Sequence, residues 1–189
     1  MPRPFVCKPR QDARFCKPID SVPPHHRMAM SDNTPQLHFR LAEAGDESFI
    51  LGMAERLLSF DLPAWRKPKD ALSHLRADLR RHLRDEPPGS YMFIAEDDAG
   101  TAAAFLHLQK GSDMLSGKPT VHISDLAIPA TREGQGIGRA LLDYAADWAR
   151  EHGADALTLN VFPGNTRAHA LYERAGFQTD LLKLVRPLR

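Results

Sequence analysis

The sequence predicts one α/β domain preceded by an irregular tail, and three observations lead to this prediction. From residue 37 onward, stretches in which apolar and polar residues alternate are interspersed with stretches whose apolar residues recur at helical spacing. A glycine-rich turn joins one of these predicted strands to a predicted helix. Residues 1–35, in contrast, hold 7 of the 15 prolines and show no apolar periodicity.

Composition narrows the function classes. The chain has 189 residues and a formal net charge of +1, so no charge imbalance points to a nucleic-acid partner. No apolar run approaches the roughly 20 residues that a membrane span needs, and no membrane partner is expected. Both cysteines lie near the N-terminus, so no disulfide framework holds the domain and we expect a cytoplasmic protein.

The tail, residues 1–35, is expected to be flexible, and the domain is expected to span residues 36–189. Met28 and Met30 directly precede the patterned region, which leads to the hypothesis that the native protein starts there and lacks the tail. No metal is predicted, because the cysteines and two neighbouring histidines match no zinc-binding spacing: Cys7, Cys16, His25 and His26.

The first half of the domain predicts one strand and two helices. Apolar and polar residues alternate over residues 37–41, as in a half-buried strand. Asp46 is placed to cap a helix over residues 46–58, whose apolar residues recur at helical spacing. Two prolines interrupt the pattern over residues 59–68, and residues 70–84 predict a second helix with its leucines on one side.

The second half predicts five strands and two helices. In chain order these are strands over residues 91–95 and 102–108 with a turn at 97–100, a strand over 121–128, a helix over 136–152, a strand over 157–161, a helix over 166–175 and a strand over 177–185. Glycines follow both helices, at Gly153 and Gly176, as is common at helix ends.

The strand over residues 121–128 has a slipped alternation, because its first two apolar residues share one parity and its last two share the other. A β-bulge near Ser124 and Asp125 would reconcile the two halves. A strand buried on both faces would need no bulge. The pattern leaves both interpretations open.

The glycine-rich turn predicts a phosphate site. Gly134, Gly136 and Gly138 lie between a strand and a helix, and without Cβ atoms they let a bulky anion approach the backbone. The first turn of the helix adds unpaired N–H groups and a positive dipole end. Arg132 and Arg139 flank the turn and would supply positive charge. A tight turn without a ligand is the alternative, although such a turn usually needs one glycine.

Two common phosphate motifs do not match. A dinucleotide fingerprint spaces its glycines as G-x-G-x-x-G, whereas this turn has G-x-G-x-G. A nucleoside-triphosphate loop has Lys and then Ser or Thr after its last glycine, whereas Arg139 and Ala140 stand here.

Two blocks of sequence resemble motifs of the GNAT N-acetyltransferases. Residues 128–142, with the glycine turn, resemble the acetyl-CoA-binding motif, and residues 160–177 resemble the C-terminal motif N-x-x-A-x-x-[LF]-Y-x-x-x-G-F. The resemblance covers residues 37–186. It implies an α/β (α+β) fold with a mixed, mostly antiparallel sheet of about six to seven strands and about four helices. In one departure, Glu133 stands where the family usually has Gln or Arg.

The resemblance also implies a site and a reaction. Acetyl-CoA would be the co-substrate, without a metal, and Tyr172 would protonate the leaving thiolate. Asp125 is the first candidate for the general base, ahead of His122. The residues expected to contact acetyl-CoA are Leu126, Ala127, Ile128, Arg132, Glu133, Gly134, Gln135, Gly136, Ile137, Gly138, Arg139, Asn165, Ala168 and Tyr172.

Some of these assignments have competing interpretations. Tyr172 also fits a core aromatic residue on an amphipathic helix, and Asp125 also fits a structural ion pair. Asn165 is placed to cap the last helix, with Asn160 as a rival for a contact to acetyl-CoA. The acceptor side is expected to include residues 59–67, whose aromatic residues would either stack on the acceptor or anchor the loop.

The expected reaction is acetyl transfer to a primary amine by direct attack in a ternary complex. A small-molecule acceptor is the first expectation, and a protein acceptor, at an N-terminus or a lysine, is the second. A sensor module that binds acyl-CoA without turnover is a third interpretation. The family also leads us to expect a homodimer.

Overall fold

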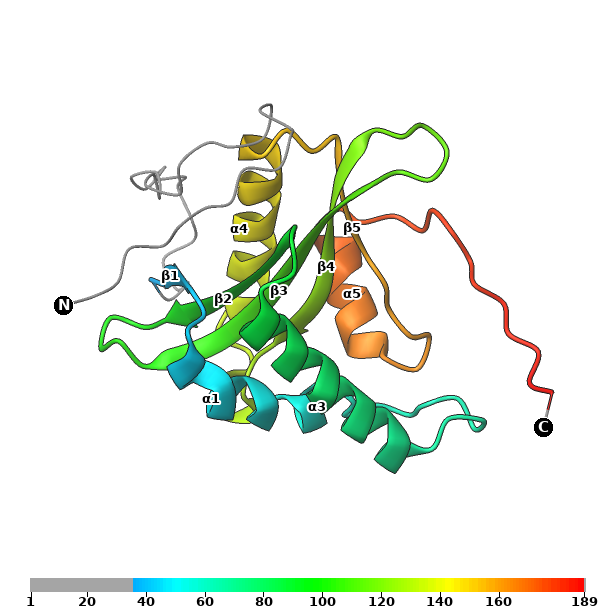
Figure 1. Cartoon of the computed structure of the whole chain (residues 1–189), viewed down its shortest axis with the longest axis horizontal. Helices are drawn as coiled ribbons and strands as arrows, with labels where there is room; N and C mark the ends of the chain where they lie inside the picture. Colours follow the sequence, from blue (N-terminus) through cyan, green and yellow to red (C-terminus); the bar gives the residue numbers. More distant parts are fainter. Residues whose placement is uncertain (1–35, 189) are drawn as a thin grey trace. The chain divides into compact units, whose positions relative to one another are not determined.

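The computed structural model describes residues 36–188, which form a mixed α/β domain around one five-stranded sheet (Figure 1). The expectations for the tail, residues 1–35, lie outside the described residues. In chain order the elements are β1 (His38–Leu41), the 3-10 helix η1 (Ala44–Asp46), α1 (Glu47–Gly52), α2 (Ala54–Leu57), α3 (Pro68–Asp85), β2 (Ser90–Glu96), β3 (Ala102–Ser112), β4 (Pro119–Ala127), η2 (Ala130–Arg132), α4 (Ile137–Glu151), β5 (Ala156–Leu159) and α5 (Thr166–Arg174).

The sheet has the order β1-β2-β3-β4-β5. The first four strands pair antiparallel through short connections, and β5 pairs parallel with β4 because α4 carries the chain back across the sheet. The predicted mixed, mostly antiparallel sheet is therefore confirmed, although the described residues supply five strands rather than six or seven.

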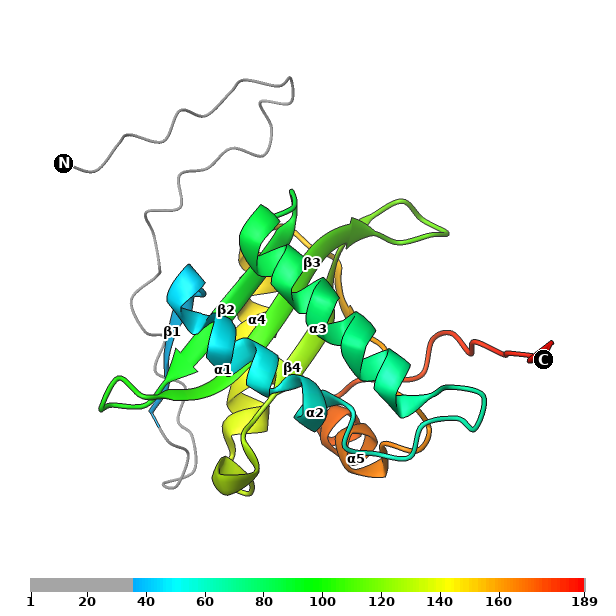
Figure 2. The same cartoon turned by 60° about the horizontal axis from the view of Figure 1, so that its bottom comes forward.

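Helices cover both faces of the sheet (Figure 2). On one face α4 buries Ile137, Leu141 and Trp148 against apolar residues of β2, β3 and β4. On the other face α1 and α3 bury Ile50 and Leu79. Strand β2 alternates between the two clusters, with Met92 and Ile94 on one face and Phe93 and Ala95 on the other, as the period of two requires for a sheet with both faces covered.

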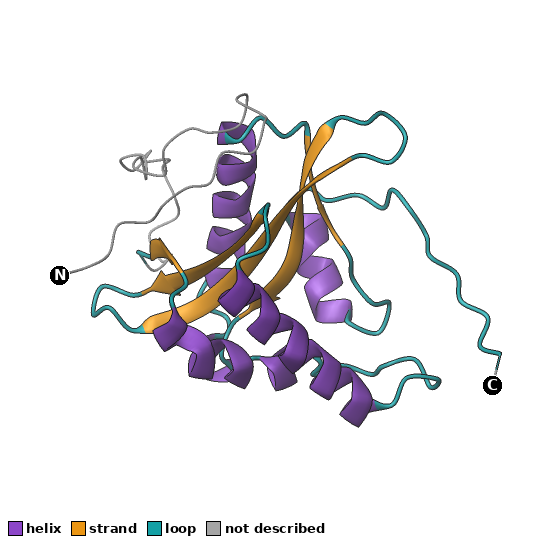
Figure 3. Ribbon diagram, viewed as in Figure 1, coloured by secondary structure: helices purple, strands orange, loops and turns teal. Residues whose placement is uncertain are grey.

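The strand predicted over residues 177–185 is wrong. This segment leaves α5 without regular structure and runs as a loop in Figure 3. A strand persists only where its backbone pairs with a neighbour and its apolar face is covered. Neither condition holds here, because Leu181, Leu182 and Leu184 are 72 %, 76 % and 91 % exposed.

The helix predicted over residues 46–58 is divided into η1, α1 and α2. Asp46 does not cap α1 with its side chain, as we had expected. Its carboxylate instead accepts a hydrogen bond from the backbone N–H of Glu43 (2.8 Å) and pairs with Arg40 (2.7 Å), which lies on β1. The carboxylate thus stabilises the turn that precedes the helix and ties it to the sheet edge.

The helices of residues 36–188 include no segment long and apolar enough to cross a bilayer.

Replacing Leu79 by Ala tests the importance of the cluster under α3. Leu79 is fully buried, so the substitution removes apolar contacts and leaves a cavity. We expect the free energy of unfolding, measured by urea denaturation, to fall by about 2–5 kcal/mol. Leu115→Ala is the control, because that side chain is 91 % exposed, and it should change stability by less than about 0.5 kcal/mol. Equal effects of the two substitutions would contradict this packing.

Candidate active site

The glycine turn has the backbone conformation that its glycines permit. Gly134 and Gly136 have φ of 75° and 80°, in the left-handed region that other residues rarely adopt. Gly136 is the N-cap of α4, and the turn therefore leads directly into the first, unpaired N–H groups of this 15-residue helix. Such an end, with a positive dipole, suits a phosphate group.

Gly138 serves close packing rather than an unusual φ. A Cβ added there would lie 3.0 Å from Cδ2 of Leu171 on α5 and 3.4 Å from Cδ1 of Ile128, which follows β4. The start of α4, the end of β4 and α5 therefore meet at this glycine. The structure thus brings together three segments that the sequence predicted for the site.

Glu133, which departs from the family pattern, is held by two arginines. Its carboxylate forms ion pairs with Arg56 of α2 and Arg167 of α5. Glu133 lies at the C-terminal end of η2, directly before the glycine turn. Its negative charge is therefore compensated by two cations, and it links α2 and α5 to that turn.

The two arginines expected to face a phosphate have protein partners. Arg132 donates to Asp97 in the turn between β2 and β3 (2.6 Å). Hydrogen bonds from the backbone N–H of Thr101 and from Arg132 lower the pKa of Asp97. Arg139 donates to Asp143 (2.9 Å) one turn along α4. The backbone of the turn is thus the better candidate for the main anion contact.

The structure decides between the two interpretations of β4 that the sequence left open, because the strand contains a bulge. Asp125 pairs with His107 of β3, but the next pair joins Ile123 to Leu108, so Ser124 has no partner across the strands. The parallel pairing of β4 with β5 also ends at Ile123 and Leu159. Backbone groups of β4 beyond the bulge consequently have no partner on the β5 side, and they belong to the stretch 126–128 that is expected to contact acetyl-CoA.

Tyr172 and Asn165 lie on α5. Burial raises the pKa of the Tyr172 phenol above its ordinary value of 10.0, so the group stays protonated at neutral pH. The ring packs edge-on against Phe177, at 5.9 Å between centroids. The side chain of Asn165 accepts a hydrogen bond from the N–H of Ala168 (3.3 Å), which confirms the predicted cap.

Asp125 and His122 have different surroundings. Oδ2 of Asp125 lies 2.9 Å from Nδ1 of the buried His107, and the Asp125 side chain is 13 % exposed. Both ring nitrogens of His122 are engaged, with Thr158 Oγ1 at 2.8 Å and Asn160 Nδ2 at 3.3 Å. Burial lowers the pKa of His122. Only one carboxylate oxygen of Asp125 has a hydrogen-bond partner among the described residues, so Asp125 is the better candidate to accept a proton.

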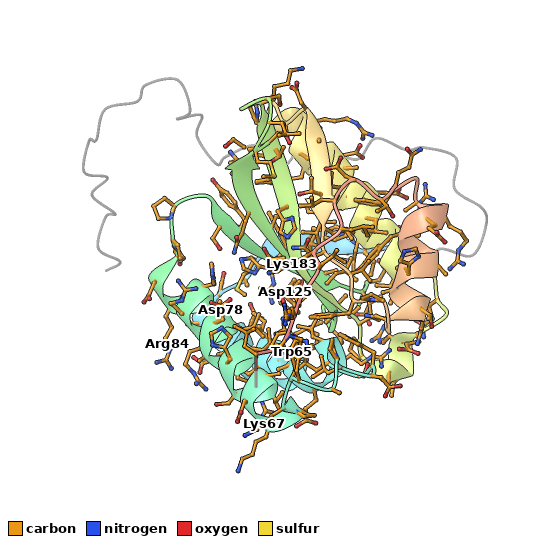
Figure 4. All side chains as sticks on the ribbon, turned by 90° about the vertical axis from the view of Figure 1, so that its right-hand side faces the viewer. Trp65, Lys67, Asp78, Arg84, Asp125 and Lys183 are labelled. Atoms are coloured by element: carbon orange, nitrogen blue, oxygen red, sulfur yellow. The ribbon has the colours of Figure 1, made fainter. Side chains whose placement is uncertain are left out.

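The loop between α2 and α3 packs against the segment between β5 and α5. A Cβ on Gly164 would lie 2.7 Å from the carbonyl oxygen of Asp61, and Phe60 packs against Phe162 at 5.3 Å between centroids. Phe60 thus anchors the loop. Trp65 is 45 % exposed, and in Figure 4 it is seen below Asp125.

The sequence did not predict the partners of Asp125. His107 is fully buried, and its Nε2 lies 2.9 Å from Oγ of Ser90 on β2. One signal was present, because His107 interrupts an otherwise apolar run over residues 102–108. A buried histidine in such a run needs polar partners, and a strand neighbour can supply them.

Comparison with known proteins gives a consistent result. The acetyltransferase (GNAT) family profile matches residues 53–177. Over 92 residues, which are 49 % of this chain and 28 % of the relative, the sequence is 40 % identical to mycothiol acetyltransferase of Propionibacterium freudenreichii subsp. shermanii. It is 31 % identical to the peptidyl-lysine N-acetyltransferase YjaB of Salmonella typhimurium over 119 residues, 60 % of this chain and 72 % of the relative.

A solved structure of the aminoglycoside N-acetyltransferase AAC(6')-Iy in complex with CoA has the same fold, with a TM-score of 0.61 at 19 % identity. The alignment covers 85 % of this chain and 100 % of the other. This chain spans less than a third of the length of the mycothiol acetyltransferase. Because the family profile matches well over half of its residues and the fold agrees, the chain belongs to the acetyltransferase (GNAT) family.

Proposed function

We propose that this protein transfers the acetyl group of acetyl-CoA to a primary amine. The observation that carries the proposal is the meeting of three features: the glycine turn at the start of α4, the bulge where β4 separates from β5, and α5 with Tyr172. Gly138, in contact distance of both other segments, joins them. An anion site, free strand backbone and a proton donor are the parts that thioester chemistry with a nucleotide-bearing substrate requires.

The residues divide the chemistry in the following way. N–H groups of residues 134–138 bind the pyrophosphate, and backbone groups of β4 beyond Ser124 hold the thioester arm and polarise its carbonyl. Asp125 takes a proton from the acceptor ammonium, and the neutral amine attacks the carbonyl carbon. The new C–N bond forms as the C–S bond breaks, and Tyr172 gives its proton to the departing thiolate. The nitrogen of the new amide releases its second proton, which restores the Tyr172 phenol, and Asp125 returns its own proton to solvent.

A small-molecule amine is the proposed acceptor class. The support is the mycothiol acetyltransferase relative, whose name states a small-molecule substrate. A protein acceptor is the second candidate, favoured by the peptidyl-lysine N-acetyltransferase relative. Trp65 lies in the same loop as Phe60 and is exposed, and it offers an aromatic surface to either acceptor. A homodimer remains a prediction.

An acceptor screen tests the proposal. Acetyl-CoA is incubated with a panel of small primary amines, with peptides that carry a free N-terminus and with peptides that carry lysine, and release of free thiol is measured. Thiol release with small amines supports the first acceptor class, and release only with peptides supports the second. Tight binding of acetyl-CoA without release for any acceptor would instead identify a sensor and overturn the proposal.

Gly136→Val tests the anion site. A β-branched residue at φ of 80° is strained by about 1–3 kcal/mol, and the turn is expected to relieve this strain by redirecting its N–H groups. Affinity for acetyl-CoA, measured by calorimetry, should fall at least about tenfold, which corresponds to about 1.4 kcal/mol. Gly153→Val is the matched control, because Gly153 has φ of 72° at the other end of α4. Intact affinity in the Gly136 variant would refute the backbone site.

Tyr172→Phe tests the proton donor. The substitution keeps the packing against Phe177 and removes the hydroxyl, so affinity for acetyl-CoA should stay within a few fold. Loss of a general acid should lower kcat by roughly 100- to 10,000-fold. Steady-state kinetics measure both quantities. A variant with unchanged kcat would remove Tyr172 from the mechanism.

Asp125→Asn tests the base. The amide keeps an acceptor for His107 but cannot take a proton, so kcat/KM at neutral pH should fall by roughly 100-fold or more. The deficit should shrink as pH rises toward the pKa of the acceptor, because more of the amine is then already neutral. A deficit that is constant over this pH range would indicate a structural role for Asp125.

A further inference from the structure

Polar side chains form a continuous row across the otherwise apolar sheet face beneath α3. Oδ2 of Asp125 on β4 lies 2.9 Å from Nδ1 of His107 on β3. Nε2 of His107 lies 2.9 Å from Oγ of Ser90 on β2, and that oxygen lies 2.8 Å from Nδ1 of His82 on α3. The row ends at Nε2 of His82, which is 3.2 Å from Nη2 of Arg81.

The row is enclosed by the protein along most of its length. His107 is fully buried and His82 is 9 % exposed, and they pack against each other at 4.6 Å between ring centroids. Arg81, in contrast, is more than half exposed, and it pairs with Asp78 on the same helix. Figure 4 shows Asp125 in the middle of this side of the domain and Asp78 to one side of it, on α3.

Donor and acceptor chemistry gives the row one direction. Arginine can only donate, so Nε2 of His82 must accept and its proton must be on Nδ1. That N–H donates to the oxygen of Ser90, which leaves the single Ser90 hydroxyl proton to be donated to Nε2 of His107. His107 then carries its own proton on Nδ1 and donates it to Asp125. Each polar atom in the row is satisfied when both histidines are neutral and Asp125 is ionised.

Two further observations agree with this direction. Burial lowers the pKa of His82, which favours its neutral form. The alternative, in which a protonated His82 donates to Asp78, fails on distance, because Nε2 of His82 and Oδ2 of Asp78 are 3.8 Å apart. The amide nitrogen of Gln109, 3.5 Å from Nε2 of His107, is a second, longer donor to the atom that must accept.

Few charged or titratable side chains lie near the two ends of the row, Asp125 and His82. Asp125 is approached by His107 from β3, by His82 from α3 and by His122 from its own strand. Burial alone would raise the pKa of Asp78, but the hydrogen bond and the charge of Arg81 hold it below its ordinary value. The side chain of His122 bonds to β5 and does not enter the row.

We propose that His82, Ser90 and His107 are positioning residues, which form a one-directional hydrogen-bond chain from the surface of α3 to Asp125 and keep that carboxylate ionised and fixed. This proposal rests on the proposed function in one respect, namely that Asp125 is the base. The aligned N–H and O–H dipoles point their positive ends at Asp125, and hydrogen bonds in such a chain strengthen one another. The chain also supplies the polar partner that a partly buried carboxylate needs.

The chain restricts how Asp125 works. Because Oδ2 is held by His107, the second oxygen is the one that receives a proton from the acceptor ammonium. In that step an N–H bond of the ammonium breaks and an O–H bond on Asp125 forms, while the N–H of His107 stays in place. The carboxylate can therefore accept the proton without turning, which preserves its orientation from one turnover to the next.

The direct test is the tautomer of the two histidines. The full-length protein is labelled with ¹⁵N-histidine, and long-range ¹H–¹⁵N spectra are recorded at pH 7. We expect His82 and His107 to be neutral with their protons on Nδ1. His107 with its proton on Nε2, or a charged His82, would overturn the proposal. This measurement needs no acceptor amine.

Ser90→Ala tests the effect on catalysis, because it breaks the chain and leaves the contact of His107 with Asp125. We expect kcat/KM to fall roughly tenfold, with the acidic limb of its pH profile at higher pH, since the carboxylate loses stabilisation. Ser90→Thr keeps the hydroxyl and should restore both the limb and the tautomer. Ser73→Ala, on the exposed side of α3, should change neither.

The outcomes separate the two proposals. An unmoved acidic limb in folded Ser90→Ala protein overturns the chain, even if Asp125→Asn is impaired. Nδ1 tautomers in a protein that acetylates no amine would instead leave the chain in place and remove the proposed function. If Ser90→Ala does not fold, as judged by its melting temperature, the tautomers of the native protein and of Ser90→Thr decide the question.

Discussion

The site depends on one extra residue in β4. Ser124 has no partner on β3, and this bulge reverses which side chains face which sheet surface. With strict alternation, Asp125 would lie on the same face as Ile123, in the apolar cluster under α4, where a carboxylate has no partner. The bulge moves Asp125 to the face of His107 and leaves Leu126 to pack against the α4 cluster.

The same bulge also determines what happens at the other edge of β4. Pairing of β4 with β5 stops at Ile123, so the two strands separate just before Ser124 and Asp125. A gap between parallel strands exposes backbone groups that must find other partners. The bulge therefore places the Asp125 carboxylate and unpaired backbone groups of β4 within a few residues of one another, and the first turn of α4 packs against the end of β4 at Gly138.

Much of this arrangement was predictable from the sequence because it follows local rules. The elements from α3 to α5 were predicted with the correct type, since their apolar residues keep a clear period and glycines mark their ends. The slipped parity of residues 121–128 indicated the bulge but could not establish it, because a doubly buried strand has the same pattern. The strand predicted over residues 177–185 is wrong because strand-like residues form no strand unless a neighbouring strand pairs with them.

The hydrogen-bond chain could not be predicted because it is built across the sheet rather than along the sequence. Ser90 and His107 are 17 residues apart, and His107 and Asp125 are 18 apart; only the strand register brings them together. No local pattern distinguishes such a serine from a solvated one. The lone histidine in an apolar strand was the one available signal, and it indicates that polar partners exist without identifying them.

Glu133 illustrates how a departure from a motif can be compensated. An acid beside a phosphate-binding turn should weaken anion binding, since like charges repel. Here the charge of Glu133 is opposed by Arg56 and Arg167. The three side chains together carry a net charge of +1, whereas Glu133 alone would carry −1. The pairs also connect α2 and α5 through Glu133. Glu133 thus holds two cations close to the glycine turn, where we propose that the pyrophosphate binds, and a neutral residue at that position would leave Arg56 and Arg167 without a common partner.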